Sequence, residues 1–197
     1  MSQAQSRSKS HPAPGARRTA EGVLATRAGL LRIRWSPAGV GSLRFARPGD
    51  APGATPVPAW IARPLRAHLA GRPSGLARIP LDLEGTPFQR RAWAALRRVP
   101  AGRTVSYGAL AARLGVPRGA RAVGRAAASN PVALLVPCHR LVGGRGALTG
   151  FRWGIERKRA LLALEARSGR KDAHGTSGPG TTRRGRHGMR GSGAHAR

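Results

Sequence analysis

The sequence is poor in cysteine and in acidic residues. It holds 1 Cys among 197 residues, which excludes an internal disulfide and any zinc site built from several cysteines. A lone thiol also fits a reducing compartment. Only 7 Asp and Glu stand against 36 Lys and Arg, so the formal net charge is +29. This excess favours a polyanionic partner, because each phosphate that a protein neutralises releases condensed counterions.

Long apolar runs are missing as well. The sequence has no stretch of about 20 apolar residues, the length a membrane-spanning helix needs, and no apolar signal core at its start. The basic residues are not confined to the ends, since residues 1–19 hold only 4 of them and residues 167–197 hold 8. We therefore expect a cytoplasmic protein without membrane contact, whose partner is a nucleic acid.

The composition divides the chain into four segments. Residues 1–19 are rich in Pro, Ser and Arg, and residues 167–197 are rich in Gly, Ser and Arg. Both are predicted to be disordered basic tails, because they contain too little apolar surface to fold. Residues 20–84 and residues 85–166 differ in pattern and are predicted to form two domains.

The first of these domains begins with three β-like runs separated by turn residues. The runs are GVLATRA (22–28), LLRIRWS (30–36) and VGSLRFA (40–46). A helix is predicted over residues 59–70, with its early part disrupted by Pro64 because proline lacks an N–H. Residues 79–83 (IPLDL) are predicted as a further strand. The result is a small α/β unit in which no side chain stands out chemically.

The second domain is punctuated by helix caps. Thr86 before Pro87 predicts a helix start, and residues 100–102 (PAG) predict its end. Its expected core face consists of Phe88, Ala92, Trp93 or Ala95, and Leu96. Ser106 is predicted to cap a helix that runs to Leu114, followed after about three residues by a helix over residues 118–129. Two short helices joined so tightly form either a helix-turn-helix or an ordinary helical hairpin.

The single cysteine lies in the sequence NPVALLVPCHR (130–140). The apolar run before it predicts a buried strand or extended segment. A lone cysteine is most often a small buried hydrophobe, but a neighbouring His139 and Arg140 are expected to lower the pKa of the Cys138 thiol. Adjacent side chains of an extended chain point to opposite sides. His139 is therefore expected to reach the sulfur through a water, with a carboxylate orienting its imidazole.

These motifs resemble the 6-O-alkylguanine-DNA alkyltransferases, also called methylated-DNA–protein-cysteine methyltransferases. The resemblance rests on GTPFQRRAWAALRRVPAGRTVSYGALAARLG, then ARAVGRAAASNPVALLVPCHR, then GALTGFRWGIERKRALLALEA, in the order of the family. It runs from Gly85 to Ala166, about two fifths of the chain. It implies an α/β N-terminal RNase H-like domain followed by a mainly α C-terminal domain of the winged-helix-like, helix-turn-helix type.

The resemblance also implies an activity. An alkyl group is transferred from the exocyclic oxygen of guanine in double-stranded DNA to Cys138, irreversibly and once per molecule, after the base has left the duplex. Alkylated thymine is a second candidate substrate. The family needs no cofactor and no metal, and we expect a monomer. Nothing in the sequence corresponds to the four-cysteine zinc domain of some bacterial relatives.

Individual residues match family positions. Cys138 matches the alkyl acceptor, His139 the base that acts through water, and Glu165 its carboxylate partner. Asn130 matches the residue that braces the active-site turn, and Tyr107 the phenol that bonds a ring nitrogen of the extruded guanine. The DNA-contacting positions are Arg121, which fills the hole left by the base, with Ala122, Gly124, Ala127 and Arg140. The pocket positions are Leu141, Phe151, Arg152 and Trp153.

Two departures from the family and three other functions remain to be weighed. Many relatives carry Tyr at the position of Phe151, and a bulky and a basic residue at Ala127–Ala128. The alternatives are a non-catalytic binder of alkylated DNA, a helix-turn-helix regulator that reads the major groove, and a cysteine hydrolase. Cys138 argues against the first, because such binders lack the acceptor. The missing oxyanion-hole signature argues against the last.

Overall fold

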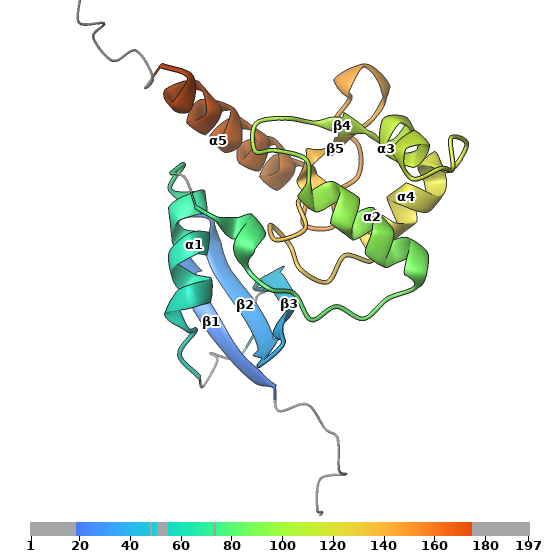
Figure 1. Cartoon of the computed structure of the whole chain (residues 1–197). Helices are drawn as coiled ribbons and strands as arrows, with labels where there is room; N and C mark the ends of the chain where they lie inside the picture. Colours follow the sequence, from blue (N-terminus) through green and yellow to red (C-terminus); the bar gives the residue numbers. More distant parts are fainter. Residues whose placement is uncertain (1–18, 48, 51–54, 73, 175–197) are drawn as a thin grey trace, which may run out of the picture.

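The computed structural model describes residues 19–47, 49–50, 55–72 and 74–174 (Figure 1). The fold is mixed α/β. The sheet with α1 lies at one end of the molecule, and α2, α3 and α4 lie together at the other. The first half contains β1 (Ala20–Thr26), β2 (Gly29–Ser36), β3 (Gly39–Phe45), α1 (Ala59–Leu69) and η1 (Leu76–Arg78). The second contains α2 (Pro87–Arg97), β4 (Val105–Ser106), α3 (Tyr107–Arg113), α4 (Ala120–Ala128), η2 (Cys138–Arg140), β5 (Leu141–Val142), η3 (Gly144–Gly146) and α5 (Ile155–His174).

The three predicted β-like runs form an antiparallel sheet of order β1-β2-β3. Thr26 pairs with Gly29, which leaves a two-residue turn between β1 and β2. Gly29 has a φ of 103°, a backbone conformation that residues with a side chain rarely adopt. Alternate residues of β2, such as Leu31 and Ile33, are fully buried, while Arg32 lies on the opposite face. The sheet therefore has one apolar face toward the core and one charged face.

Helix α1 runs through Pro64, so the expectation that proline disrupts its early part is wrong. Pro64 removes a single backbone hydrogen bond, and burial of Ile61 and Leu65 keeps the helix in place. The predicted strand at residues 79–83 is reduced to one parallel bridge between Val40 and Leu81. Proline at position 80 has no N–H to extend the ladder.

The caps of the second half are confirmed. Thr86 and Gln89 form a capping box at the start of α2, and Ser106 accepts a hydrogen bond from the backbone at the start of α3. The helix expected over residues 118–129 is shorter and begins at Ala120. A turn closed by the hydrogen bond from Gly119 N to Val116 O, 2.7 Å long, occupies the residues before it. Proline at position 117 suits such a turn better than a helix start.

The expected strand before Cys138 is also corrected. The segment is buried, but beyond one bridge between Leu43 and Val132 it is a series of turns, and Leu134 has a φ of 68°. A leucine in the left-handed region costs about 1 kcal/mol. Backbone bonds to β3 hold the segment: Leu43 N donates to Pro131 O at 2.9 Å, and Ala133 N donates to Leu43 O at 2.8 Å.

Helix α5 continues to His174, so disorder does not begin at residue 167 as expected. The predicted tails are otherwise outside the described residues. The buried side chains of the two halves form one continuous core, from Leu24 of β1 to Leu161 of α5. No helix in the described part of the chain is long and apolar enough to cross a membrane.

Candidate active site

Cys138 begins the short η2 turn and is 6% exposed. Asn130 holds this turn through both ends of its amide. Its Nδ2 donates to the Cys138 Sγ at 3.2 Å and to Val136 O at 2.9 Å, and its Oδ1 accepts from Val132 N at 3.0 Å. The side chain is fully buried. One amide thus fixes both the backbone before the cysteine and the position of the sulfur.

The buried carboxylate of Glu165 accepts hydrogen bonds from several elements. His139 Nε2 lies 2.9 Å from its Oε1, and Arg140 bonds both oxygens, at 2.7 and 2.9 Å. The backbone N–H of Gly102 donates to Oε2 at 3.2 Å. All three side chains are buried. The carboxylate orients the imidazole, because an oxygen acceptor requires the hydrogen to be on Nε2.

Burial and the neighbouring side chains shift the pKa values of Glu165 and His139. Burial alone raises the pKa of Glu165, but the hydrogen bonds from His139 and Arg140 and the nearby imidazole of His68 outweigh it, so the pKa lies well below its ordinary value. Burial lowers the pKa of His139 despite the carboxylate beside it. The imidazole is therefore neutral at physiological pH, and its buried Nδ1 has no hydrogen-bond partner. This nitrogen is available to accept a proton.

The expectation that His139 and Arg140 lower the thiol pKa is wrong. Burial raises the pKa of the Cys138 thiol to about 11, and the opposing contributions come from the Asn130 side chain, the backbone N–H groups of Cys138 and His139, and the charge of Lys158, not from the side chains of His139 and Arg140. Lys158 of α5 is fully buried, and its Nζ donates to Thr149 O at 2.7 Å. The imidazole of His139 is neutral, and the charge of Arg140 is cancelled by its ion pair with Glu165, so neither side chain offers positive charge to the sulfur.

A small electrophile should therefore react with Cys138 only in alkaline solution. The rate of alkylation by iodoacetamide should rise about tenfold per pH unit and level off only near pH 11, the pKa of the thiol. Lys158→Met should move this curve to higher pH, because it removes the cation that lowers the thiol pKa. Arg159→Met, which removes an exposed charge from the next residue, should leave it unchanged. A plateau near the ordinary thiol value of 9.0 would contradict this picture.

Cys138 opens onto a pocket of about 380 Å³. Its lining comes from α3, α4, η2 and the loop before α5. The lining residues are Tyr107, Gly124, Ala127, Ala128, Cys138, Gly150, Phe151 and Arg152. The structure thus brings Tyr107, Phe151 and Arg152 to the cysteine, as the sequence predicts. The pocket is large enough for a small planar group, and its small residues on α4 leave it open.

Three predicted site residues lie elsewhere. Leu141 is fully buried in β5, paired with Val105 behind the pocket. Trp153 packs edge-on against Phe151 and Phe45, with ring centroids 5.2 and 6.1 Å away, and supports the wall rather than lining it. The guanidinium of Arg140, a predicted DNA contact, points into the core, where it bonds Glu165 and Val99 O.

Helix α4 presents a basic face beside the pocket. Val123 and Ala126 face the core, and the Trp93 indole donates to Ala126 O at 2.7 Å, which ties α4 to α2. Arg121 and Arg125 are exposed on the outer side. They are four residues apart and so share one side of the helix. The sequence singled out Arg121, and the structure adds Arg125.

Two buried residues of this region were missed in the sequence. Lys158 was one of many basic residues, but its spacing from Leu161 and Glu165 places all three on one helical face. His68 of α1 lies at helical spacing from Ile61 and Leu65 and is 7% exposed. A histidine within an apolar helical face is the signal in the sequence that points to this residue.

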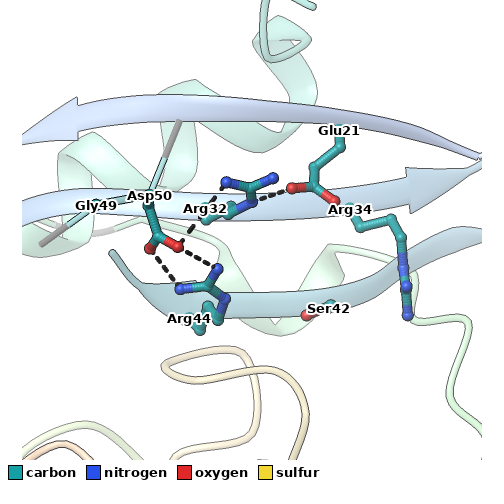
Figure 2. A pocket seen from close by; sticks show the side chains of 7 residues that line it. All are labelled: Glu21, Arg32, Arg34, Ser42, Arg44, Gly49 and Asp50. Atoms are coloured by element: carbon teal, nitrogen blue, oxygen red, sulfur yellow. Dashed lines mark hydrogen bonds and ion pairs between the residues drawn. The ribbon is translucent and has the colours of Figure 1, made fainter. Parts of the chain in front are cut away.

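A second pocket, of about 340 Å³, lies on the charged face of the sheet (Figure 2). Arg44 makes a bidentate ion pair with Asp50 at 2.6 and 2.8 Å, and Arg32 pairs with Glu21. The guanidinium beside it holds the pKa of Asp50 below its usual range. These charges largely neutralise each other across the strands. Among the described residues, no cluster of His, Cys, Asp and Glu is arranged to hold a metal ion.

Part of the chain is similar in sequence to known proteins. A family model described as "6-O-methylguanine DNA methyltransferase, DNA binding domain" matches residues 87–167. The methylated-DNA–protein-cysteine methyltransferase of Mycolicibacterium paratuberculosis is 55% identical over 89 residues, 45% of this chain and 54% of the relative. The protein of the same name from Mycobacterium tuberculosis H37Rv is 52% identical over 101 residues, 51% of this chain and 61% of the relative. In sequence, the chain thus matches little more than half the length of these relatives.

The likeness of structure extends further. The crystal structure of Mycobacterium tuberculosis O6-methylguanine methyltransferase superposes with a TM-score of 0.68 at 39% identity, over 77% of this chain and 94% of that one. The structure of Mycobacterium tuberculosis OGT in complex with DNA gives 0.67 at 40% identity, over 75% and 93%. The fold and the matched domain define a class, that of proteins with the domain described for 6-O-methylguanine DNA methyltransferases. Within it, the chain belongs to the O6-methylguanine-DNA methyltransferase family.

Proposed function

We propose that this protein repairs DNA by moving a methyl or larger alkyl group from the exocyclic oxygen of guanine in double-stranded DNA to Cys138. The observation that carries the proposal is the position of the thiol. It lies at the wall of a pocket that suits an extruded base, with a neutral histidine next to it in the chain. Relatives that bear the methyltransferase name, one of them solved with DNA, support it.

The chemistry requires the thiol to lose its proton as sulfur attacks the alkyl carbon. Because the thiol pKa is high, an unaided thiolate would be scarce at neutral pH. We assign the proton to His139 Nδ1 through one bridging water, with Glu165 stabilising the imidazolium that forms. The new bond is carbon–sulfur, and the bond that breaks joins the alkyl carbon to the guanine oxygen. Tyr107 donates to a ring nitrogen and offsets the charge developing on the base.

The products are a thioether on Cys138 and a guanine anion, which becomes guanine by taking up a proton on its ring nitrogen from water, while His139 returns its proton to water. No second cysteine exists in the sequence to reverse the modification, so each molecule acts once. The reaction needs no cofactor and no metal. Alkylated thymine is a second substrate candidate, because its exocyclic oxygen presents the same leaving group.

Access to the base requires it to leave the duplex, at a cost of a few kcal/mol. Helix α4 borders the pocket, and its small residues, Ala122, Gly124 and Ala127, allow a close approach to DNA. We assign α4 to the minor groove, whose degenerate pattern suits an enzyme that reads damage rather than sequence. Arg121 fills the space that the base vacates, and Arg125 contacts a phosphate.

Arg121→Ala should slow alkyl transfer more than it weakens DNA binding. Filling the vacated space stabilises only the extruded state, so we expect the single-turnover rate to fall about 10–100-fold, from a loss of roughly 1.4–2.8 kcal/mol. Affinity for undamaged duplex should fall far less. Quench-flow kinetics and fluorescence anisotropy measure the two quantities. Arg63→Ala, which removes an exposed charge from α1, is the matched control. Equal losses in rate and affinity for Arg121→Ala would contradict the role.

The finer description of the fold belongs to the same proposal. We assign residues 20–84 to an RNase H-like domain, supported by the antiparallel sheet with α1 on one face. We assign residues 85–166 to a winged-helix-like domain with a helix-turn-helix, supported by the packing of α3 on α4. The protein is proposed to be a cytoplasmic monomer.

The decisive experiment uses duplex DNA with one isotopically labelled 6-O-methylguanine. The label should move to the tryptic peptide that contains Cys138, and the yield should stop at one methyl group per protein molecule even with DNA in excess. A label on another residue, continued turnover, or no transfer would each overturn the proposal. Parallel duplexes with larger alkyl groups or with 4-O-methylthymine define the substrate range.

A further inference from the structure

The carboxylate of Glu165 has one partner from the N-terminal half of the chain. His68 of α1 is buried, and its Nε2 lies 3.3 Å from Glu165 Oε1. The same oxygen lies 2.9 Å from His139 Nε2 and 2.7 Å from Arg140 Nη2. Two imidazoles and one guanidinium therefore converge on a single oxygen atom. Of the four side chains in this cluster, the function proposed above uses only those of His139 and Glu165.

Hydrogen-bonding chemistry limits what the two imidazoles can do. A carboxylate oxygen only accepts, so a ring nitrogen beside it must carry a hydrogen. His139 then has Nε2–H and a bare Nδ1. His68 brings a second N–H to the same oxygen, but its Nε2 makes no well-aligned hydrogen bond. The two rings therefore share Oε1 unequally, and His139 holds the better geometry.

The charges around His68 determine how sharing of Oε1 affects His139. In the described part of the chain, the charged and titratable groups that face His68 are Glu165 from α5 and His139 and Arg140 from η2. The charges of Glu165 and Arg140 cancel each other. A proton taken up by His139 adds a positive charge beside His68. Because His68 also interacts with Oε1, this oxygen stabilises the His139 imidazolium less than it would alone.

We propose that His68 is a positioning residue of the alkyl-transfer site, which holds Glu165 Oε1 in competition with His139 and so limits how readily His139 accepts the thiol proton. The inference rests on the proposed function. It makes the N-terminal half a contributor to the chemistry through one side chain. It also predicts that removal of His68 makes His139 more basic, because the carboxylate then serves one imidazole instead of two.

The test is the pH profile of single-turnover transfer. Transfer requires neutral His139, so the rate falls on the acid side. In His68→Phe the midpoint of this fall should move up by about 0.5–1 pH unit. His68→Gln restores a neutral N–H and should give a smaller upward shift. Leu69→Ala, a buried substitution next to His68 in α1, should lower stability without moving the midpoint. An unchanged midpoint in His68→Phe would overturn the inference.

A second measurement needs no variant. In ¹⁵N-histidine-labelled wild-type protein, the ring signals of His68 should report hydrogen on Nε2 at neutral pH, as should those of His139. A His68 ring with its hydrogen on Nδ1 alone would overturn the inference, since a bare nitrogen cannot pair with a carboxylate. Different measurements test the proposed function and the role of His68. Failure of the wild-type protein to methylate Cys138 counts against the function, whereas a pH profile insensitive to His68 counts only against the role of His68.

Discussion

Replacement of Cys138 by serine is expected to abolish alkyl transfer completely while leaving the protein folded and able to bind DNA. The hydroxyl is smaller than the thiol, fits the same 6% exposed position and still accepts a hydrogen bond from Asn130. Its oxygen, however, is far less acidic and far less nucleophilic toward an alkyl carbon than sulfur. Transfer should drop to the uncatalysed background, and the free energy of unfolding should change little.

Two measurements make this result informative. Labelled transfer from 6-O-methylguanine duplex reports the chemistry, and anisotropy with the same duplex reports binding. Cys138→Ser should bind the damaged duplex with near wild-type affinity, because Arg121 and the small residues of α4 are untouched. Transfer by the variant at a measurable rate would mean that another nucleophile accepts the group. Loss of binding together with transfer would point to a folding defect.

Glu165→Gln is expected to be the most destabilising conservative change in the site. The side chain keeps its shape, but Arg140 is left with a buried and uncompensated charge. Breaking a buried ion pair in this way costs about 3–5 kcal/mol. The transfer rate should also fall about 100-fold or more, because the imidazolium of His139 loses its counter-charge. Denaturant unfolding and single-turnover kinetics measure the two effects.

The same variant has a pH signature. The folded-state pKa of Glu165 lies below the ordinary value of 4.5, so the carboxylate stabilises the fold fully above that pH and less as the pH falls through the folded value. The stability gap between wild type and Glu165→Gln should therefore narrow in acid. Glu156→Gln, on the same helix but exposed, should show no such gap. A constant gap at all pH values would rule out the ionised carboxylate as the cause.

The sequence predicted the local elements well where caps and spacing are explicit. Thr86 with Pro87 and Ser106 gave the starts of α2 and α3, and the β-like runs gave the sheet. It failed where distant contacts decide the backbone. The turns around Leu134 depend on Asn130 and on bonds to β3, neither of which leaves a periodic signal.

The electrostatic interactions of the site, like the turns around Leu134, could not be predicted from neighbours in the sequence. Proximity in sequence suggested that the side chains of His139 and Arg140 lower the pKa of the Cys138 thiol, but the η2 turn points both toward Glu165. The cation that does influence the thiol, Lys158, comes from a different helix. Neighbours in sequence are known in advance, whereas the direction in which each side chain points is set by tertiary packing.

The two backbone hydrogen bonds between Leu43 and the turn that precedes Cys138 have a consequence for how this chain can diverge from its relatives. They are made by the N–H and C=O of β3, atoms that every residue except proline supplies alike. The first half can therefore exchange most of its side chains and still hold the reactive turn in place. The sequence match covers 51% of the chain, whereas the structural match covers 77%. When cut from β3, residues 85–166 would keep the bonds of the Asn130 side chain to this turn but lose both of these backbone bonds.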